Sequence, residues 1–348
     1  MKIAQVAPLF ESVPPKLYGG TERVVSYLTE ELVKEGHDVT LFASGDSVTK
    51  ARLVPACEQS LRLDSHCIDQ MAHHIRLLNL VFNQAPQFDV LHFHIDYMHY
   101  PLSVRQKIPH LTTLHGRLDI PDLVPLYRDF PDVPLVSISN SQREPLPWVN
   151  WLATVYHGLP EELYCLREKP GDYLAFIGRI SPEKRVDRAI EIAKRAGRKL
   201  RIAAKVDAAD EKYFHEEIES LLKDSNVEYV GEIGEDEKGE FLRGAVALLL
   251  PIDWPEPFGL VMIEAMACGT PAIAWRAGSV PEVIDEGVTG FAVESVDEAV
   301  SAVEKAASFD RRTVRETFEK RFSAARMARD YVGIYQSLPA RGSPLKAA

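Results

Sequence analysis

Two glutamates, Glu256 and Glu264, stand out because their spacing places one in a loop and the other on the helix that follows it. The sequence predicts a strand over 246–251 and an apolar helix over 260–268, so Glu256 falls at the carboxyl end of a strand. There it can accept hydrogen bonds from hydroxyl groups, while Glu264 needs a partner that offsets its desolvation on an apolar helix. A diol such as a ribose could be this partner of Glu264. The alternative, a solvated glutamate beside a capping glutamate, is disfavoured because prolines flank Glu256 on both sides.

The start of this helix is expected to attract an anion. The amides of Phe258, Gly259 and Leu260 open the helix, where backbone N–H groups have no partner within the helix. Such groups, together with the helix dipole, favour phosphate and other negative groups. The sequence therefore predicts a phosphate or sugar contact at this helix end.

Two cations follow another predicted strand, over 173–178. Arg179 and Lys184 are five residues apart at the carboxyl end of that strand, where the charge of a diphosphate would be met. Arg179 can bind a phosphate in a fork, and Lys184 can act as a point charge. Cations in a surface turn are common, so this segment alone leaves a purely structural role open.

A pair of glycines, Gly19 and Gly20, precedes a predicted helix near the N-terminus. Without a Cβ their amides can approach an anion closely, although an entry loop capped by Thr21 explains the same residues equally well. The sequence contains no GxGxxG, GxxxxGK[ST], HExxH or GxSxG pattern. This disfavours dinucleotide binding, P-loop chemistry, zinc proteolysis and α/β-hydrolase chemistry.

Together these segments resemble a known family, the retaining glycosyltransferases of family 4, which have the GT-B fold. The resemblance covers essentially the whole chain and is carried by the stretches GGTERVV, GRISPEK and EPFGLVMIEAMACGTP, in which Glu256 and Glu264 form the family's E-x7-E motif. It implies that Arg179 and Lys184 bind a nucleoside diphosphate, that Glu264 binds the ribose and that Glu256 binds hydroxyls of the transferred sugar. The other donor-binding residues that it implies are Gly19, Gly20, Gly178, Phe258, Gly259 and Leu260.

The resemblance also implies a mechanism. His115, in Thr113-Leu114-His115-Gly116, matches the histidine of the N-terminal domain that faces the anomeric carbon. With Arg179, Lys184 and Glu256 it completes the expected catalytic set. The implied reaction is front-face transfer of a hexose with retention, without a metal and without a cofactor, the nucleotide sugar being a co-substrate. Relatives often carry a glycine-rich turn where this chain has Arg201-Ile202-Ala203-Ala204-Lys205, so a donor contact by Lys205 is left open.

The acceptor is expected to be a small soluble molecule. Some relatives reach lipid acceptors with a basic amphipathic helix, whereas the corresponding region here, 66–82, has Arg76 as its only fixed cation. The opening MKIAQVAPLFESVPPKLYGGTERVV resembles that of bacterial family members that transfer glucose from UDP-glucose to tetrahydrobiopterin, which implies a UDP-glucose donor and a pteridine acceptor. A sugar-nucleotide epimerase or hydrolase, and a non-catalytic nucleotide-sugar-binding protein, remain alternatives.

Alternating strand and helix patterns predict an α/β chain with two doubly wound, Rossmann-like halves. We expect an acceptor-binding domain over 1–157, a nucleotide-sugar-binding domain over 158–310, and helices over 311–338 that pack back toward the first domain. The GT-B resemblance implies that the two domains face each other across a cleft and close on the substrates.

The length, net charge and cysteine content of the chain agree with a two-domain α/β protein and limit its partners and compartment. A chain of 348 residues is long enough for two domains, and its formal net charge of −11 disfavours nucleic acid as a partner. The four cysteines form no paired pattern, which favours a reducing compartment, with the cytoplasm as the default. No stretch reaches the length of a membrane span, and no stable membrane association is expected.

Overall fold

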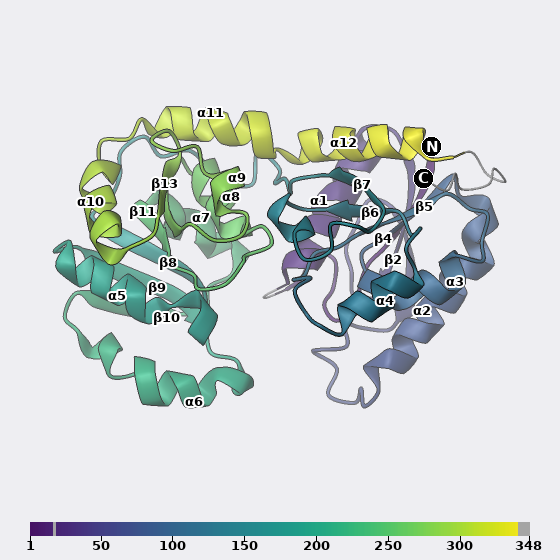
Figure 1. The fold of residues 1–348 in the computed structure, drawn as a ribbon, viewed down its shortest axis with the longest axis horizontal. Coiled ribbons are helices and arrows are strands. Elements are labelled where there is room, and N and C mark those ends of the chain that lie inside the picture. Colours follow the sequence, from purple (N-terminus) through teal and green to yellow (C-terminus); the bar gives the residue numbers. More distant parts are fainter. Residues whose placement is uncertain (17–18, 340–348) are drawn as a thin grey trace. The chain divides into compact units, whose positions relative to one another are not determined.

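The computed structural model describes residues 1–16 and 19–339, which form two compact units, each built around a parallel β-sheet (Figure 1). Unit 1 comprises residues 1–158 together with the chain from Ala324 onward, and unit 2 comprises Leu159–Ser323. Each unit has its own buried apolar core. The chain is therefore an α/β protein with two Rossmann-like domains.

Unit 1 contains a seven-stranded sheet in the order β3-β2-β1-β4-β5-β6-β7. Its strands are β1 (Lys2–Val6), β2 (Asp38–Ser44), β3 (Arg52–Cys57), β4 (Val90–Phe93), β5 (His110–Thr113), β6 (Leu135–Ser137) and β7 (Trp151–Thr154). Successive strands are added first on one side of β1 and then on the other. The order reverses between β1 and β4, which pair directly, with Gln5 beside His92.

Unit 2 repeats this plan with six strands in the order β10-β9-β8-β11-β12-β13. They are β8 (Tyr173–Arg179), β9 (Lys199–Lys205), β10 (Val227–Gly231), β11 (Ala245–Leu250), β12 (Ala272–Trp275) and β13 (Gly290–Val293). The order reverses between β8 and β11. In open α/β sheets ligands bind at this reversal, outside the carboxyl ends of the strands.

Helices connect the strands and cover the sheets. Those of unit 1 are α1 (Gly20–Lys34), α2 (Gln70–Gln84), α3 (Tyr100–Ser103), α4 (Leu123–Asp129) and α12 (Ala324–Ser337). Those of unit 2 are α5 (Val186–Arg195), α6 (Glu211–Tyr213), α7 (Glu235–Arg243), α8 (Leu260–Ala267), α9 (Val280–Val283), α10 (Val296–Ala306) and α11 (Arg311–Phe322). In α5, Val186, Ala189, Ile190 and Ala193 recur at helical spacing and are buried, so an apolar stripe holds this helix on its sheet.

The sequence patterns identify the central strands and miss three others. The alternating patterns predict strands over 2–7, 38–43, 89–94, 111–115, 135–139, 173–178, 199–205, 227–230, 246–251 and 271–275. The strand predicted over 199–205 matches β9, and the others differ from the observed strands by one or two residues at one or both ends. The missed strands β3, β7 and β13 each lie at an edge of a sheet. An edge strand needs fewer buried residues than a central one; β3, for example, is largely accessible and contains Pro55.

The C-terminal helices are divided differently from the expected single segment over 311–338. Helix α11 belongs to unit 2, where it packs against α8, whereas α12 belongs to unit 1 and packs against α1. The chain leaves the helical conformation at Ser323, between the two. In α12, Tyr331 and Tyr335 are buried in unit 1, so this helix completes the first domain.

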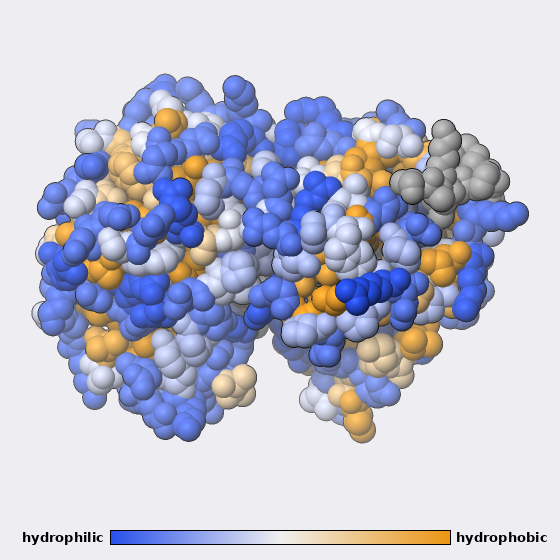
Figure 2. Space-filling view, viewed as in Figure 1, coloured by the Kyte–Doolittle hydropathy of each residue, from blue (hydrophilic) through white to orange (hydrophobic). Residues whose placement is uncertain are grey.

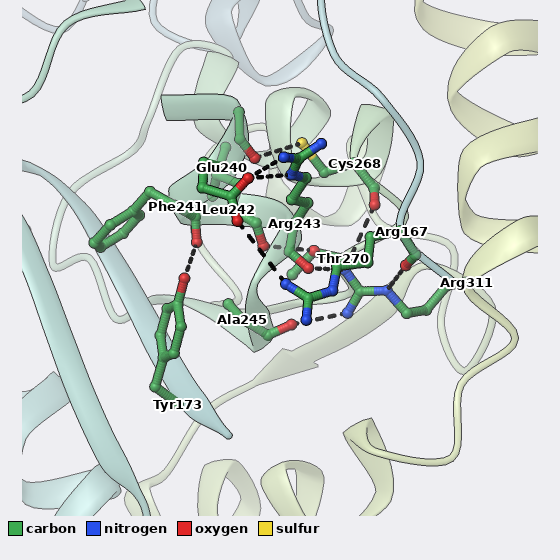
Figure 3. A network of polar contacts seen from close by, with 11 residues as sticks. Arg167, Tyr173, Glu240, Phe241, Leu242, Arg243, Ala245, Cys268, Thr270 and Arg311 are labelled. Carbon is green, nitrogen blue, oxygen red and sulfur yellow. Dashed lines mark hydrogen bonds and ion pairs between the residues drawn. The ribbon is translucent and has the colours of Figure 1, made fainter. Parts of the chain in front are cut away.

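A buried arginine anchors α11 to unit 2 (Figure 3). The Arg311 guanidinium donates hydrogen bonds to the carbonyl oxygens of Arg167, Arg243 and Ala245 at 2.7, 3.0 and 2.8 Å, and also to the Thr270 hydroxyl. Burial lowers its pKa to about 10. Arg167 precedes β8, and the other partners precede or begin β11 and β12, at the amino ends of the strands, opposite the edge where ligands bind in such sheets. Arg311 is therefore a structural residue.

Hydrophilic residues cover most of the face shown in Figure 2, and hydrophobic residues form separate patches on it. Within the described residues, no helix is long and apolar enough to cross a membrane.

Candidate active site

The predicted donor-binding residues of unit 2 lie in the loops that follow β8 and β11, where the strand order reverses. Arg179 ends β8, and Lys184 ends the short helical turn Pro182–Lys184 just after it. Glu256 lies in the loop after β11, immediately before α8. The two neighbouring strands thus deliver two cations and a carboxylate to the same edge of the sheet.

Lys184 and Glu256 form the central contact of this arrangement. Lys184 Nζ lies 2.5 Å from Glu256 Oε2, and both side chains are less than a fifth exposed. The same ammonium lies 4.8 Å from the centre of the Trp254 ring, within the range of a cation–π contact. The loops after β8 and β11 are therefore joined by an ion pair built from two predicted site residues.

Arg179 is surrounded by carboxylates that the sequence analysis did not include in the site. Its guanidinium lies 2.5 Å from Glu183, 3.6 Å from Asp207 and 3.4 Å from Asp210. Burial raises the pKa of Asp207, but hydrogen bonding and attraction from Lys205 and then Arg179 outweigh this, so the net shift is downward. Lys205, the residue left open above, lies 2.8 Å from Asp207. Any anion that binds Arg179 must therefore compete with these carboxylates.

Helix α8 presents its first turn next to Glu256. Gly259 is its N-cap residue, with a left-handed φ of 75° that favours glycine. A Cβ at this position would come within 2.8 Å of the Met262 side chain and 3.3 Å of Glu256. Phe258 is buried, and Leu260 begins the helix. The Met262 amide donates to the Gly259 carbonyl at 3.0 Å, and the amides at the start of such a helix generally lack a carbonyl partner and attract negative groups.

Glu264, at the centre of α8, is 4% exposed and pairs with a lysine that the sequence patterns did not reveal. Lys238 Nζ, on α7, lies 2.9 Å from Glu264 and 3.3 Å from Glu235. Lys238 supplies the partner that the burial of Glu264 requires. Lys238 follows Glu235 by three residues on a charged helix, which is the spacing of an ordinary surface pair, and only the packing of α7 against α8 brings it to Glu264.

A glycine distant in the sequence supports the loop that contains Glu256. Gly278 has a φ of +56°, and a Cβ there would lie 2.3 Å from the Glu256 carbonyl oxygen and 2.4 Å from its nitrogen. By contrast, a Cβ on Gly178 would meet nothing closer than a Phe176 carbon at 3.9 Å. Close packing against the backbone of Glu256 therefore requires a glycine at 278. Packing among the described residues does not require a glycine at 178.

Unit 1 contains the remaining predicted residues. Gly19 is the N-cap of α1 and Gly20 its first residue, so the helix does not use Thr21 as a cap. A Cβ on Gly19 would lie 2.8 Å from Pro15 and 3.2 Å from the carboxylate of Glu22. The amides at the start of α1 thus share their surroundings with a buried glutamate, whose pKa is raised, mainly by burial.

His115 lies two residues beyond the end of β5. It belongs to a group of hydrogen-bonded polar side chains that the sequence analysis did not identify. Its Nε2 atom lies 2.9 Å from Nδ1 of His94, and the His94 Nε2 atom lies 2.8 Å from Oε1 of Gln5. Burial lowers the pKa of His115 to about 3, so the ring is neutral at physiological pH. The alternating pattern of β4 places His92 and His94 on one face, but it did not indicate that they contact residues of β1 and β5.

The two sets of residues provide different chemistry. Unit 2 offers cations and helix amides for negative oxygens, together with two carboxylates for hydroxyl groups. Unit 1 offers a neutral imidazole that can exchange hydrogen bonds with a hydroxyl group. Among the described residues, no three His, Cys, Asp or Glu side chains gather in an arrangement that could hold a metal ion.

Comparison with solved structures identifies the fold. Sucrose-phosphate synthase from Thermosynechococcus elongatus superposes with a TM-score of 0.78 at 16% identity over 97% of this chain and 98% of that one. AviGT4, a glycosyltransferase involved in avilamycin A biosynthesis, superposes with a TM-score of 0.75 at 21% identity, covering 97% of both chains. The Anabaena protein HepE superposes with a TM-score of 0.74 at 16% identity, over 97% of this chain and all of that one. The fold is GT-B.

Comparison of sequences gives the family. Residues 18–178 match the model described as Glycosyltransferase Family 4, and residues 166–321 match that of Glycosyl transferases group 1. N-acetyl-alpha-D-glucosaminyl L-malate synthase of Bacillus anthracis is 26% identical over 80% of this chain and 81% of its own length. An uncharacterized glycosyltransferase of Methanocaldococcus jannaschii is 24% identical over 84% of each chain. The chain is a glycosyltransferase of the group 1 and family 4 superfamily.

Proposed function

We propose that the protein transfers a hexose, glucose, from UDP-glucose to a hydroxyl group of a small soluble acceptor, a pteridine, with retention of the anomeric configuration. The observation that carries this proposal is the gathering of Arg179, Lys184 and Glu256 with the first turn of α8, at the strand reversal of unit 2. In this proposal the cations and helix amides bind the diphosphate, and Glu256 binds hydroxyls of the sugar.

Support for the donor comes from the chemistry of the site and from a structural neighbour. Glu264 is buried and held by Lys238, so one carboxylate oxygen is oriented while the other can accept from a ribose hydroxyl. HepE, which shares the fold, has been solved with UDP, with UDP and glucose, and with UDP-glucose. We therefore assign Glu264 to the ribose, and UDP-glucose to the site.

For the acceptor, support comes from the opening sequence, which resembles that of pteridine glucosyltransferases, and from one relative. That relative is named for a product in which a sugar is joined to L-malate, a small organic acid. Tyr97 and Trp148 are exposed in unit 1 and provide flat surfaces on which a pteridine ring could stack.

The mechanism that we propose needs no carboxylate nucleophile. As the sugar–phosphate bond breaks, negative charge grows on the diphosphate, and Arg179, Lys184 and the α8 amides stabilise it. The departing phosphate oxygen takes the proton of the attacking acceptor hydroxyl, which reaches the anomeric carbon from the same face. His115 hydrogen-bonds the transferred sugar, and no metal or additional cofactor takes part.

The experiment that tests the donor is a thermal-shift panel with UDP, GDP, ADP and CMP. A ligand at a hundred times its Kd adds about 2.7 kcal/mol to the stability of the protein, so a specific UDP complex gives a clear, selective shift. Arg179→Ala is expected to remove it, whereas Lys212→Ala, which changes an exposed lysine of unit 2, should leave it unchanged. If none of the nucleotides shifts the wild-type protein, the proposed donor site is wrong.

Turnover separates the alternatives. UDP-glucose is incubated with and without tetrahydrobiopterin, and the products are separated by chromatography and identified by mass spectrometry and by proton NMR, which distinguishes anomers and epimers of equal mass. A glucosylated pteridine of α-configuration supports the proposal. Release of glucose at the same rate without acceptor indicates a hydrolase, an altered nucleotide sugar indicates an epimerase, and UDP binding without any turnover indicates a binding protein.

A further inference from the structure

A chain of hydrogen bonds in unit 1 runs from the C-terminal helix to His115. Gln5 Nε2 donates to the Tyr335 hydroxyl at 3.1 Å, and Gln5 Oε1 lies 2.8 Å from His94 Nε2. His94 Nδ1 lies in turn 2.9 Å from His115 Nε2. Gln5, His94 and Tyr335 are buried, so each hydrogen bond is shielded from water.

The chemistry of the glutamine sets the direction of this chain. Because its nitrogen donates to Tyr335, its oxygen faces His94 and can only accept, so His94 must carry its proton on Nε2. A neutral imidazole with a proton on Nε2 has a lone pair on Nδ1, which accepts from His115. His115 must therefore carry its own proton on Nε2, which leaves the lone pair on its Nδ1.

Burial keeps both rings neutral. It lowers the pKa of His94 well below its ordinary value, with the neighbouring histidines contributing further, and it lowers that of His115 to about 3. A second branch supports the same direction at Tyr335, whose hydroxyl lies 2.7 Å from His92 Nδ1. That hydroxyl accepts from Gln5, so its single proton is available for His92.

His115 Nδ1 is the last atom in this series of hydrogen bonds. It is buried and has no hydrogen-bond partner among the described residues. A buried polar atom without a partner is costly, and it differs here from the preceding side chains of this series of hydrogen bonds, whose atoms in the series are all paired. The lone pair therefore calls for a hydrogen-bond donor that is not part of the described protein, and a sugar or acceptor hydroxyl is a donor of that kind.

We infer that Gln5 and His94 are positioning residues, which hold His115 as the neutral tautomer protonated on Nε2 so that its Nδ1 accepts a hydrogen bond from a substrate hydroxyl. The inference rests on the proposed function, because that function supplies the hydroxyl. It gives the buried amide of Gln5 and the α12 residue Tyr335 a role in the reaction, although neither touches the substrate.

The first test is spectroscopic and needs no substrate. In the full-length protein labelled with ¹⁵N-histidine, two-bond ¹H–¹⁵N spectra distinguish the two neutral tautomers, and a His115→Gln spectrum assigns the signals of His115 among the eleven histidines. We expect His115 to be neutral with its proton on Nε2. A His115 ring protonated on Nδ1, or on both nitrogens, at neutral pH overturns the inference.

Variants then connect the tautomer to the reaction. Gln5→Met removes both hydrogen bonds of the amide, and we expect His115 to populate both tautomers and kcat to fall about fivefold, which corresponds to about 1 kcal/mol for one buried hydrogen bond. His94→Leu should act in the same way. His94→Asn, which places an acceptor oxygen close to the former Nδ1, should restore both the tautomer and much of kcat.

The control is Tyr331→Phe. Tyr331 bonds Thr113 at 2.8 Å in the same buried region, but it lies outside the segment from Tyr335 to His115. We expect this variant to keep the wild-type tautomer and kcat while losing a comparable amount of stability. If Tyr331→Phe and Gln5→Met lower kcat equally with His115 unchanged, the residues are merely structural and the inference fails.

The spectrum and the turnover assay can fail separately. If His115 has the expected tautomer but no nucleotide sugar is turned over, the proposed function is wrong and only the hydrogen-bond chain stands. If UDP-glucose is turned over and His115 carries its proton on Nδ1, the proposed function stands and the inference is overturned.

Discussion

Lys184 Nζ and Glu256 Oε2 are 2.5 Å apart, so a cation assigned to phosphate and a carboxylate assigned to sugar hydroxyls neutralise each other across the strand reversal of unit 2. Each partner thereby orients the other without leaving an unpaired charge. When a diphosphate binds, Lys184 gains a second negative partner. Variants of the two residues should therefore have different effects.

Replacement of Lys184 should affect the chemical step most strongly. Loss of one charge-stabilising donor typically costs about 2.7–4 kcal/mol in the transition state, so we expect kcat of Lys184→Ala to fall a hundredfold or more. Arg179→Ala should behave similarly. Steady-state kinetics with UDP-glucose measures both, with Lys212→Ala as the control for loss of an exposed cation. Near-wild-type turnover in both variants would contradict the assignment.

Glu256→Gln should separate catalysis from nucleotide binding. Glutamine keeps the shape of the side chain but loses the charge that strengthens hydrogen bonds to sugar hydroxyls, which are worth about 1.5–3 kcal/mol with a charged partner. We expect kcat to fall between about tenfold and a hundredfold, with the UDP affinity unchanged or raised because Lys184 is released. Calorimetric titration with UDP checks this. A loss of UDP affinity as large as the loss of activity would show that the division of roles is wrong.

The pair of Lys238 and Glu264 makes a prediction about stability. Lys238→Met leaves a carboxylate buried without its cation, and breaking a buried pair in this way costs about 3 kcal/mol. We expect the double variant Lys238→Met/Glu264→Gln to recover much of that loss while binding UDP weakly, because the ribose partner is gone. Urea unfolding followed by circular dichroism measures the first effect. Equal stabilities of the single and double variants would argue against a buried pair.

Arg311 should be essential for the stability of unit 2 and irrelevant to the donor. Arg311→Met leaves several buried carbonyl groups without donors, at about 1–3 kcal/mol for each group, so the unfolding temperature should fall by several degrees. The matched control is Arg312→Ala, which removes an exposed pair with Glu168 and should have little effect. The variants are compared by calorimetry, and the Kd for UDP should not change at temperatures where both are folded.

Acid should destabilise unit 1 through its buried histidines. His92, His94 and His115 have pKa values lowered by burial, that of His115 to about 3, whereas in the unfolded chain they take up protons near pH 6.5. The unfolded state binds more protons below that pH, so the free energy of unfolding is level above about pH 7 and falls as the pH drops from 6.5 toward 3.

The size of this effect is checked by removing one titrating group. Each neutral buried histidine contributes a slope of up to about 1.4 kcal/mol per pH unit. The stability of His94→Asn should therefore change with a smaller slope between pH 6 and pH 4. Identical slopes for wild type and His94→Asn would show that the buried rings are charged in the folded protein.

Much of the architecture is determined locally by the sequence. The central strands are short apolar runs and the helices carry apolar stripes, as in β9 and α5, so the α/β class and the two doubly wound halves follow from periodicity alone. The edge strands β3 and β7 do not follow, because most of their residues are accessible and form no apolar run, and the edge strand β13 was missed although it is mostly buried. The assignment of α11 and α12 to different units likewise depends on packing partners far away in the chain.

The candidate site also has one part that the sequence determines and another that depends on the fold. The sequence by itself determined that Arg179, Lys184, Glu256 and the start of α8 follow strands, because residue type and spacing express that directly. Only the tertiary structure decided their partners, since Lys238, Gly278 and Gln5 reach Glu264, Glu256 and His94 across 22 to 89 positions of the chain. Residue spacing indicates the secondary structure of one segment and the chemical groups on it. Burial and pairing arise when separate segments pack together, and no local pattern contains that information.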